Sequence, residues 1–177
     1  MAQRESTPAG NGLFATPEPP ELGPGPRTTV DSIAVVTQRA EELCARHNVR
    51  AATRPLVRAL ALLWHDHLEA AHQIVQDLAG ADASYIHAIM HRREPDFANA
   101  KYWFHRVGSH PAYPTLAERA RDHLTSPAGA RLRTRICPEG NWDAFAFVDA
   151  CAEARSMDDL RAVQALEFTV LLERWLA

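Results

Sequence analysis

The stretch TRPLVRALALLWHDHLEAAHQIVQDL, residues 53–78, carries the clearest helical pattern in the chain. Thr53 is a helix-capping residue type, and Pro55 falls in the first turn, where its missing N–H costs little. Apolar residues then recur at steps of three and four and form one long stripe: Val57, Leu60, Trp64, Leu68, Ala71, Val75 and Leu78. The spacing predicts a single amphipathic helix over 53–78.

The sequence on either side repeats this kind of pattern. Capping residues and periodic apolar positions predict further helices over about 31–48, 83–94, 96–107, 115–124, 142–154 and 158–175. The Arg-rich segment SPAGARLRTRICPEGN, residues 126–141, is expected to be a connector. Alternating β-branched runs separated by turn residues are missing from the sequence, which argues against a sheet. We therefore expect an all-α single domain, a helical bundle or short helical array of about six to seven helices.

The N-terminal segment differs in composition from the rest of the chain. Six of the twelve prolines fall within the first 26 residues. Such a segment buries too little apolar surface to offset the entropy lost on ordering. The sequence therefore predicts a disordered, Pro-rich N-terminal tail over residues 1–28 and an all-helical domain over residues 29–177.

The overall composition narrows the environment and the partners. The net charge of −3 gives no basic surface for general nucleic-acid binding, so no nucleic-acid partner is expected. No apolar run is long enough to span a membrane, and the first residues lack the apolar region of a signal peptide, so no membrane partner is expected. Three cysteines without C-x-x-C spacing indicate reduced thiols, and we expect a cytoplasmic protein.

Two segments resemble an uncharacterised family of bacterial and fungal helical proteins. HAIMHRREPDFANAKYWFHRVGSHP, residues 87–111, is similar to the family's HxIMHRRExDxxNxKYWFxRVGxHP-type segment. WDAFAFVDAC, residues 142–151, is similar to its WDxFxFVDxC segment. The family has no established activity, so the resemblance implies a helical fold and assigns no catalytic residues. The helical pair that begins at residue 83 also resembles one step of a tetratricopeptide-like repeat, without a second copy at a fixed period.

Histidines and carboxylates gather on the edges of two predicted helices. At about 100° per residue, one edge of the helix over 53–78 and one face of the helix over 83–94 carry the candidate metal ligands: His65, Glu69 and His72, then His87, His91 and Glu94. The short linker AGAD predicts antiparallel packing, which would bring the two edges together. Such a set suits a divalent metal (Zn, Fe, Mn or Ni), and with it metal-assisted hydrolysis.

Three other interpretations of these edges stay open. They could line a metal-free pocket for a polar small ligand, or they could be solvated edges stabilised by His–Glu pairs. The His65–Asp66 dipeptide is also reminiscent of the metal-binding pair of the HD phosphohydrolases. Against this, Asp66 projects away from the apolar stripe, as a solvated residue would, whereas His67 projects into the apolar arc. Whether the protein is an enzyme stays undecided.

Cationic and aromatic residues around Pro95 suggest a different class of function. A non-catalytic protein-interaction module would present a helical surface, or a ligand-binding surface, built from Arg92, Tyr102, Arg106 and His110. The simpler use of Arg92 or Arg93 is an ion pair with Glu94 or Asp96.

Overall fold

A computed structural model describes residues 12–153 and 157–177 of the chain. This part forms nine α-helices and one short 3₁₀ turn, and it contains no strand. The elements in chain order are α1 Ile33–Arg46, α2 Arg54–Trp64, α3 Leu68–Val75, α4 Ala81–Arg93, α5 Phe97–Val107, α6 Tyr113–His123, α7 Pro127–Ile136, η1 Pro138–Gly140, α8 Ala144–Glu153 and α9 Met157–Leu176. The all-α class is confirmed, but the expected number of helices is not.

The prediction of six to seven helices was low for two local reasons. The helix expected over 53–78 is two helices, because Asp66 adopts φ +62° and ends the first of them. The Arg-rich connector contains α7, which Ser126 caps by accepting a hydrogen bond from the Gly129 N–H at 2.9 Å. Leu132 and Ile136 bury the inner side of α7.

The turn between α2 and α3 has the hydrogen bonds of a Schellman C-cap. The His67 N–H donates to the Leu62 carbonyl at 2.9 Å, and the Asp66 N–H donates to Leu63. This motif needs a left-handed residue, usually glycine, and an aspartate fills the position here. The apolar stripe gave no indication of this break, because Trp64 and Leu68 keep the helical spacing across it.

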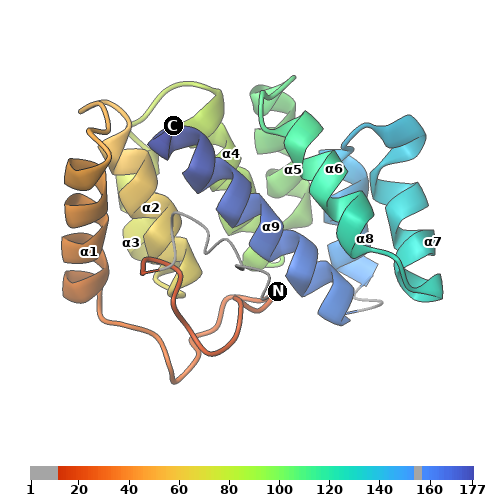
Figure 1. Cartoon of the computed structure of the whole chain (residues 1–177), viewed down its shortest axis with the longest axis horizontal. Helices are drawn as coiled ribbons and strands as arrows, with labels where there is room; N and C mark the ends of the chain where they lie inside the picture. The colour runs from red at the N-terminus through yellow and green to blue at the C-terminus, as the bar shows by residue number, and fades with distance from the viewer. Residues whose placement is uncertain (1–11, 154–156) are drawn as a thin grey trace, which may run out of the picture.

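The helix α9 is the central element of the bundle. It runs diagonally across the molecule in Figure 1, with α1–α3 on one side and α6–α8 on the other. It packs against α2 and α6, while α4 packs against α2 and α5, and α8 packs against α5 and α7. The core side chains Tyr85, Phe104, Phe147 and Phe168 are buried where these helices meet. No described helix combines the length and apolarity needed to cross a bilayer.

Part of the predicted tail lies on the helices. Residues 1–11 fall outside the described part of the chain, but residues 12–27, which we call the N-terminal strap, contact α2, α4 and α9 (Figure 1). Leu13 and Leu22 are buried, and the Phe14 ring stacks on Trp64 with centroids 4.6 Å apart. The flexible tail expected up to residue 28 is therefore not what the structure has over residues 12–27. The few apolar residues of the strap are buried on the bundle, and hydrogen bonds from the helices hold its backbone.

Candidate functional site

The break between α2 and α3 separates His65 from the other predicted metal ligands. His65 follows the last residue of α2 and is 1 % exposed. Its Nδ1 accepts a hydrogen bond from the Asp31 N–H at 3.2 Å, and its Nε2 lies 3.0 Å from the Leu13 carbonyl. Both ring nitrogens are thus used to hold the N-terminal segment. Because Nδ1 accepts a hydrogen bond, the ring proton lies on Nε2, which donates to the Leu13 carbonyl, and burial lowers the pKa of His65.

The neighbouring Asp66 is buried, not solvated as its helical projection predicted. Its Oδ2 accepts hydrogen bonds from Arg27 N and Arg27 Nε, each at 2.8 Å. Its Oδ1 accepts from Arg93 Nη2 at 2.6 Å. Burial works against the charged carboxylate, but the hydrogen bonds from Arg27 and Arg93 outweigh it and hold the pKa of Asp66 below its ordinary value. The His65–Asp66 pair therefore fastens the strap, and it gives the HD phosphohydrolase interpretation no support.

Three of the six predicted metal ligands do meet between α3 and α4. The ring centroids of His72 and His87 lie 5.3 Å apart, those of His72 and His91 lie 6.1 Å apart, and those of His87 and His91 lie 6.2 Å apart. Glu94 joins this edge by pairing with His91 Nδ1 at 3.1 Å. Glu69 lies exposed on α3 and accepts a hydrogen bond from Gln73.

The described residues nevertheless show no metal site at these three imidazoles. Among the described residues, no three His, Cys, Asp or Glu side chains form a group that could hold a metal ion. The His87 ring lies flat on Trp103, with centroids 4.0 Å apart and planes 5° apart, and it is nearly parallel to His91. Stacking fixes His87 in this orientation. Burial, together with the nearby His72 and His91, lowers the pKa of His87 to about 4, so this ring is neutral at pH 7.

The four residues of the predicted partner surface do not share one surface. Arg92 is 1 % exposed and pairs with Glu167 inside the bundle. His110 is 3 % exposed, with Nε2 3.0 Å from the Asp82 carboxylate and Nδ1 accepting from the Ala112 N–H. Both side chains are therefore buried and find their partners within the bundle, apart from the exposed surface of α5. Tyr102 and Arg106 do lie exposed on α5, where the Arg106 guanidinium stands 5.9 Å from the Tyr102 ring centre.

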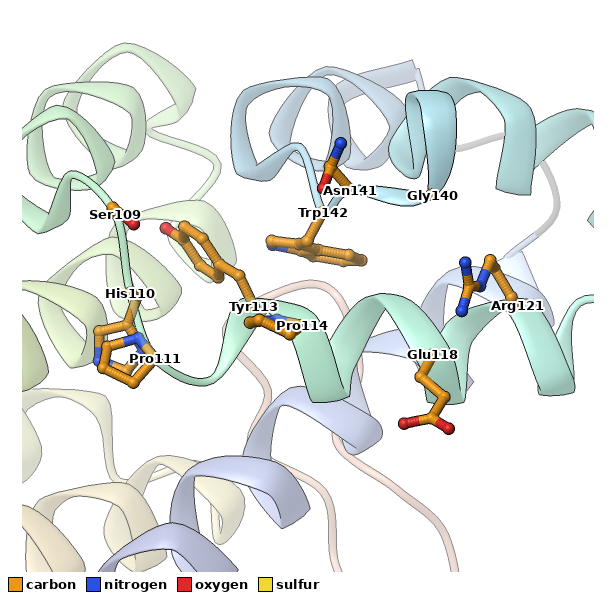
Figure 2. Close-up of a pocket in the computed structure, with 10 residues that line it drawn as sticks. All are labelled: Ser109, His110, Pro111, Tyr113, Pro114, Glu118, Arg121, Gly140, Asn141 and Trp142. Carbon is orange, nitrogen blue, oxygen red and sulfur yellow. The ribbon is translucent and has the colours of Figure 1, made fainter.

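A groove between α6 and the turn at η1 was not singled out from the sequence. Its volume is about 640 Å³, and it is lined by Ser109, His110, Pro111, Tyr113, Pro114, Glu118, Arg121, Gly140, Asn141 and Trp142. Figure 2 shows the Trp142 ring between Tyr113 and Arg121, above α6. The same view shows Arg121 directed to the side of the helix that faces Trp142 and Glu118 directed away from it.

Two nitrogen groups in this groove lack protein partners. Trp142 is 7 % exposed, and its Nε1 has no hydrogen-bond partner within the described chain. Arg121 makes no hydrogen bond or ion pair in the part of the chain that the structure describes. Gly140 has φ +84°, and a Cβ there would lie 2.8 Å from Arg121 Nη1, so the missing side chain lets the guanidinium rest on this turn. Arg121 is exposed to solvent, whereas buried donors such as Trp142 Nε1 are nearly always satisfied in folded proteins, so this N–H is a place where a bound molecule could accept a hydrogen bond.

The sequence offered only a weak indication of this groove. Trp142 and Arg121 are separated by 20 intervening positions (122 to 141), and neither belongs to the histidine-rich edges. The C-P-E-G-N-W turn, residues 137–142, contains Pro138 and Gly140, and such turns place side chains at the rim of a helical bundle. Only the packing of α6 beside this turn brings the two side chains to one groove.

Comparison of the chain with protein-family models, with curated proteins and with solved structures finds no match. The resemblance to a bacterial and fungal helical family and to a tetratricopeptide-like step therefore stays a prediction.

Proposed function

We propose that the protein binds a small organic anion in the groove between α6 and η1. The observation that carries the proposal is the Trp142 side chain, nine-tenths buried in the groove wall, whose N–H has no partner among the described residues, beside the Arg121 guanidinium, which has none there either. A site with an aromatic wall and a few unsatisfied polar groups is the usual form of a small-molecule site. This keeps the polar small-ligand hypothesis drawn from the sequence and moves it away from the histidine edges.

The charges of the groove favour an anion. Arg121 offers a planar set of donors that suits a carboxylate or a phosphate. Glu118 is the acidic side chain of the groove, and it points to the opposite side of α6 from Trp142. The rings of Tyr113 and Trp142 offer apolar faces to the rest of the ligand. The expected ligand therefore has an oxyanion head and a flat apolar body.

The groove supports binding more than a chemical reaction. His110 is the histidine that lines it, and both of its ring nitrogens are engaged, one by Asp82 and one by the Ala112 N–H. A general base needs a free nitrogen within reach of the substrate. We therefore expect a ligand-binding role at this groove.

Titration calorimetry with benzoate and phenyl phosphate tests the proposal. We expect saturable binding to the full chain, and a loss of roughly tenfold or more in affinity for Arg121→Ala, since a charge-assisted hydrogen bond contributes about 1.5–3 kcal/mol. Trp142→Phe keeps an aromatic wall and removes the N–H, so we expect a smaller loss. Arg131→Ala is the matched control, because Arg131 is an exposed arginine of the neighbouring helix α7 that does not line the groove.

Two results would contradict the proposal. One is the lack of saturable binding of both probes to the unmodified chain. The other is equal affinity of the Arg121→Ala and Arg131→Ala variants, which would mean that any binding occurs elsewhere.

A further inference from the structure

The N-terminal strap is held on the bundle in the way a bound peptide is held. It forms no helix and no strand over residues 12–27. Its carbonyls accept hydrogen bonds from side chains of the helices, and its side chains enter the surface between α2, α4 and α9.

Side chains of the helices donate hydrogen bonds to backbone carbonyls of the strap. Arg93 Nε donates to the carbonyls of Glu21 and Gly23, each at 3.2 Å. Gln164 Nε2 donates to the carbonyls of Pro20 and Glu21, at 3.1 and 3.0 Å. Peptide-recognition surfaces obtain affinity from such main-chain hydrogen bonds and specificity from a few side-chain pockets.

Two side chains of the strap act as anchors. The Phe14 ring stacks on Trp64 and meets the edge of Phe168, with centroids 4.6 and 5.9 Å apart. At the other end, the Arg27 guanidinium pairs with the buried carboxylate of Asp66. The anchors differ in chemistry, so the surface accepts the segment in one direction only.

Charge complementarity strengthens this directionality. Arg161 of α9 lies 3.0 Å from the Glu21 carboxylate and 3.5 Å from that of Glu18. The middle of the strap is therefore acidic where the bundle is cationic, while the Arg27 end is cationic where the bundle is acidic. A segment with these charges in another order would lose all three ion pairs.

A short connector joins the strap to the first helix. Arg27 is fixed on Asp66, and Asp31 is fixed by its N–H on His65 and by its carbonyl, which lies 2.7 Å from His67 Nε2. Between these points lie residues 28–30, of which Thr28 and Thr29 are exposed. The connector is thus a hinge at which the strap could turn toward a neighbouring molecule while α1 stays in place.

We propose that the face of α2, α4 and α9 is a peptide-binding groove, and that residues 12–27 of a second copy of this chain can occupy it in place of the chain's own strap. The occupant's chemistry is specified by the contacts above: an aromatic anchor, an acidic proline-containing middle and a C-terminal arginine. Exchange of an identical segment between copies needs no new contacts, only release of the old ones.

A cleavable hinge tests the proposal with the protein in its folded form. A protease site replaces residues 28–30 of the full chain, the protein is cut after folding, and a fluorescent peptide of residues 12–27 is added. We expect the peptide to replace the cut segment, seen as a rise in fluorescence anisotropy, at least about tenfold faster than the bundle unfolds globally. The global rate is measured on the same cut protein by denaturant jump.

Two matched peptides make the result specific. A peptide with Phe14→Ala lacks the aromatic anchor, and a peptide with the same residues in scrambled order lacks the directional charges; neither is expected to exchange. Exchange of the labelled peptide only at the rate of global unfolding would overturn the proposal, since the strap would then be an inseparable part of the core. Equal exchange of the scrambled peptide would overturn it as well.

An uncut variant covers the case in which the cut protein does not stay folded. Phe14→Ala in the full chain weakens the strap, whose attachment otherwise gives it an effective concentration in the millimolar range. We expect the labelled peptide to bind this variant at least about tenfold more tightly than it binds the unmodified chain. Equal, weak binding to both, with circular dichroism showing both folded, would also overturn the proposal.

Discussion

His87 is a buried histidine that is neutral because of its surroundings. It is 2 % exposed, and its ring is stacked on Trp103. The ring centroids of His72 and His91 lie 5.3 and 6.2 Å from that of His87. A protonated His87 ring would be desolvated and would have no carboxylate beside it to balance its charge. The pKa of His87 is therefore lowered to about 4. The residue therefore links stability to pH.

The stability of the protein should fall as the pH falls from about 6.5 toward 4. In this window the unfolded chain binds the proton at His87 and the folded chain does not, so protonation favours unfolding. At pH 5 the protonation of His87 in the unfolded chain lowers the free energy of unfolding by about 2 kcal/mol. Burial lowers the pKa of His65 as well, so His65 acts in the same direction. Urea unfolding at pH 7.5 and at pH 5 measures the effect.

His87→Phe keeps the stack on Trp103 and removes the titrating group. We expect the loss of stability between pH 7.5 and pH 5 to shrink in this variant. His105→Asn is the control, because His105 is exposed on α5, and this variant should lose as much stability as the unmodified chain. If His87→Phe also loses as much, the pH dependence originates elsewhere.

At the scale of elements, the turn between α2 and α3 connects three parts of the molecule. Asp66 at this turn receives hydrogen bonds from Arg27 of the strap and from Arg93 at the end of α4. The close approach of the strap to this carboxylate depends on a glycine. Gly25 has φ +81°, and a Cβ there would lie 2.8–2.9 Å from the side chain of Asp66.

Gly25→Ala should destabilise the folded protein, and Gly23→Ala should not. The alanine at position 25 would combine a left-handed backbone with a clash against Asp66, at a cost on the order of 1–3 kcal/mol. Gly23 has nothing within 4 Å of its Cβ position and no left-handed φ, so it is the matched control, with an expected change within about 0.5 kcal/mol. The free energies of unfolding of the two variants and of the unmodified chain, measured in urea, test this prediction. Equal values for the two variants would show that the strap does not need this contact.

At the scale of the whole molecule, a buried charge cluster ties α4 to α9. The Glu167 carboxylate of α9 pairs with Arg92 and accepts a hydrogen bond from the Tyr85 hydroxyl at 3.0 Å, both from α4. The Arg92 guanidinium also lies 4.5 Å from the ring centre of Phe147 in α8. These contacts of Arg92 and Glu167 determine how α4, α8 and α9 pack against one another.

Breaking this pair on one side should cost more than removing it entirely. Arg92→Met leaves the Glu167 carboxylate buried without its cation, so we expect a loss of about 3–5 kcal/mol. In the double variant Arg92→Met with Glu167→Leu no unpaired charge remains, and we expect much of that stability to return. A double-mutant cycle by urea unfolding measures the coupling. Additive losses would mean that the two charges do not interact in the folded state.

The sequence by itself determined the local helical structure. Three- and four-residue spacing of apolar side chains, together with capping residues such as Asp96 and Asp143, marks most of the helices, because these patterns act within one or two turns. The same spacing predicted that His72, His87 and His91 would lie on facing edges, and the packing of α3 against α4 brings them together. Local periodicity is enough for this, since the linker is short.

Only the tertiary structure decided where the helix predicted over 53–78 ends and which partners the polar side chains bind. Asp66 takes a left-handed conformation because its carboxylate is held by Arg27, 39 residues away, and by Arg93, 27 residues away. The strap is ordered by partners as distant as Gln164, which is 144 residues from Pro20. The groove of Trp142 and Arg121 likewise arises from the packing of α6 beside the η1 turn. Contacts between segments so far apart depend on how whole helices pack, and residue spacing along the chain does not encode that packing.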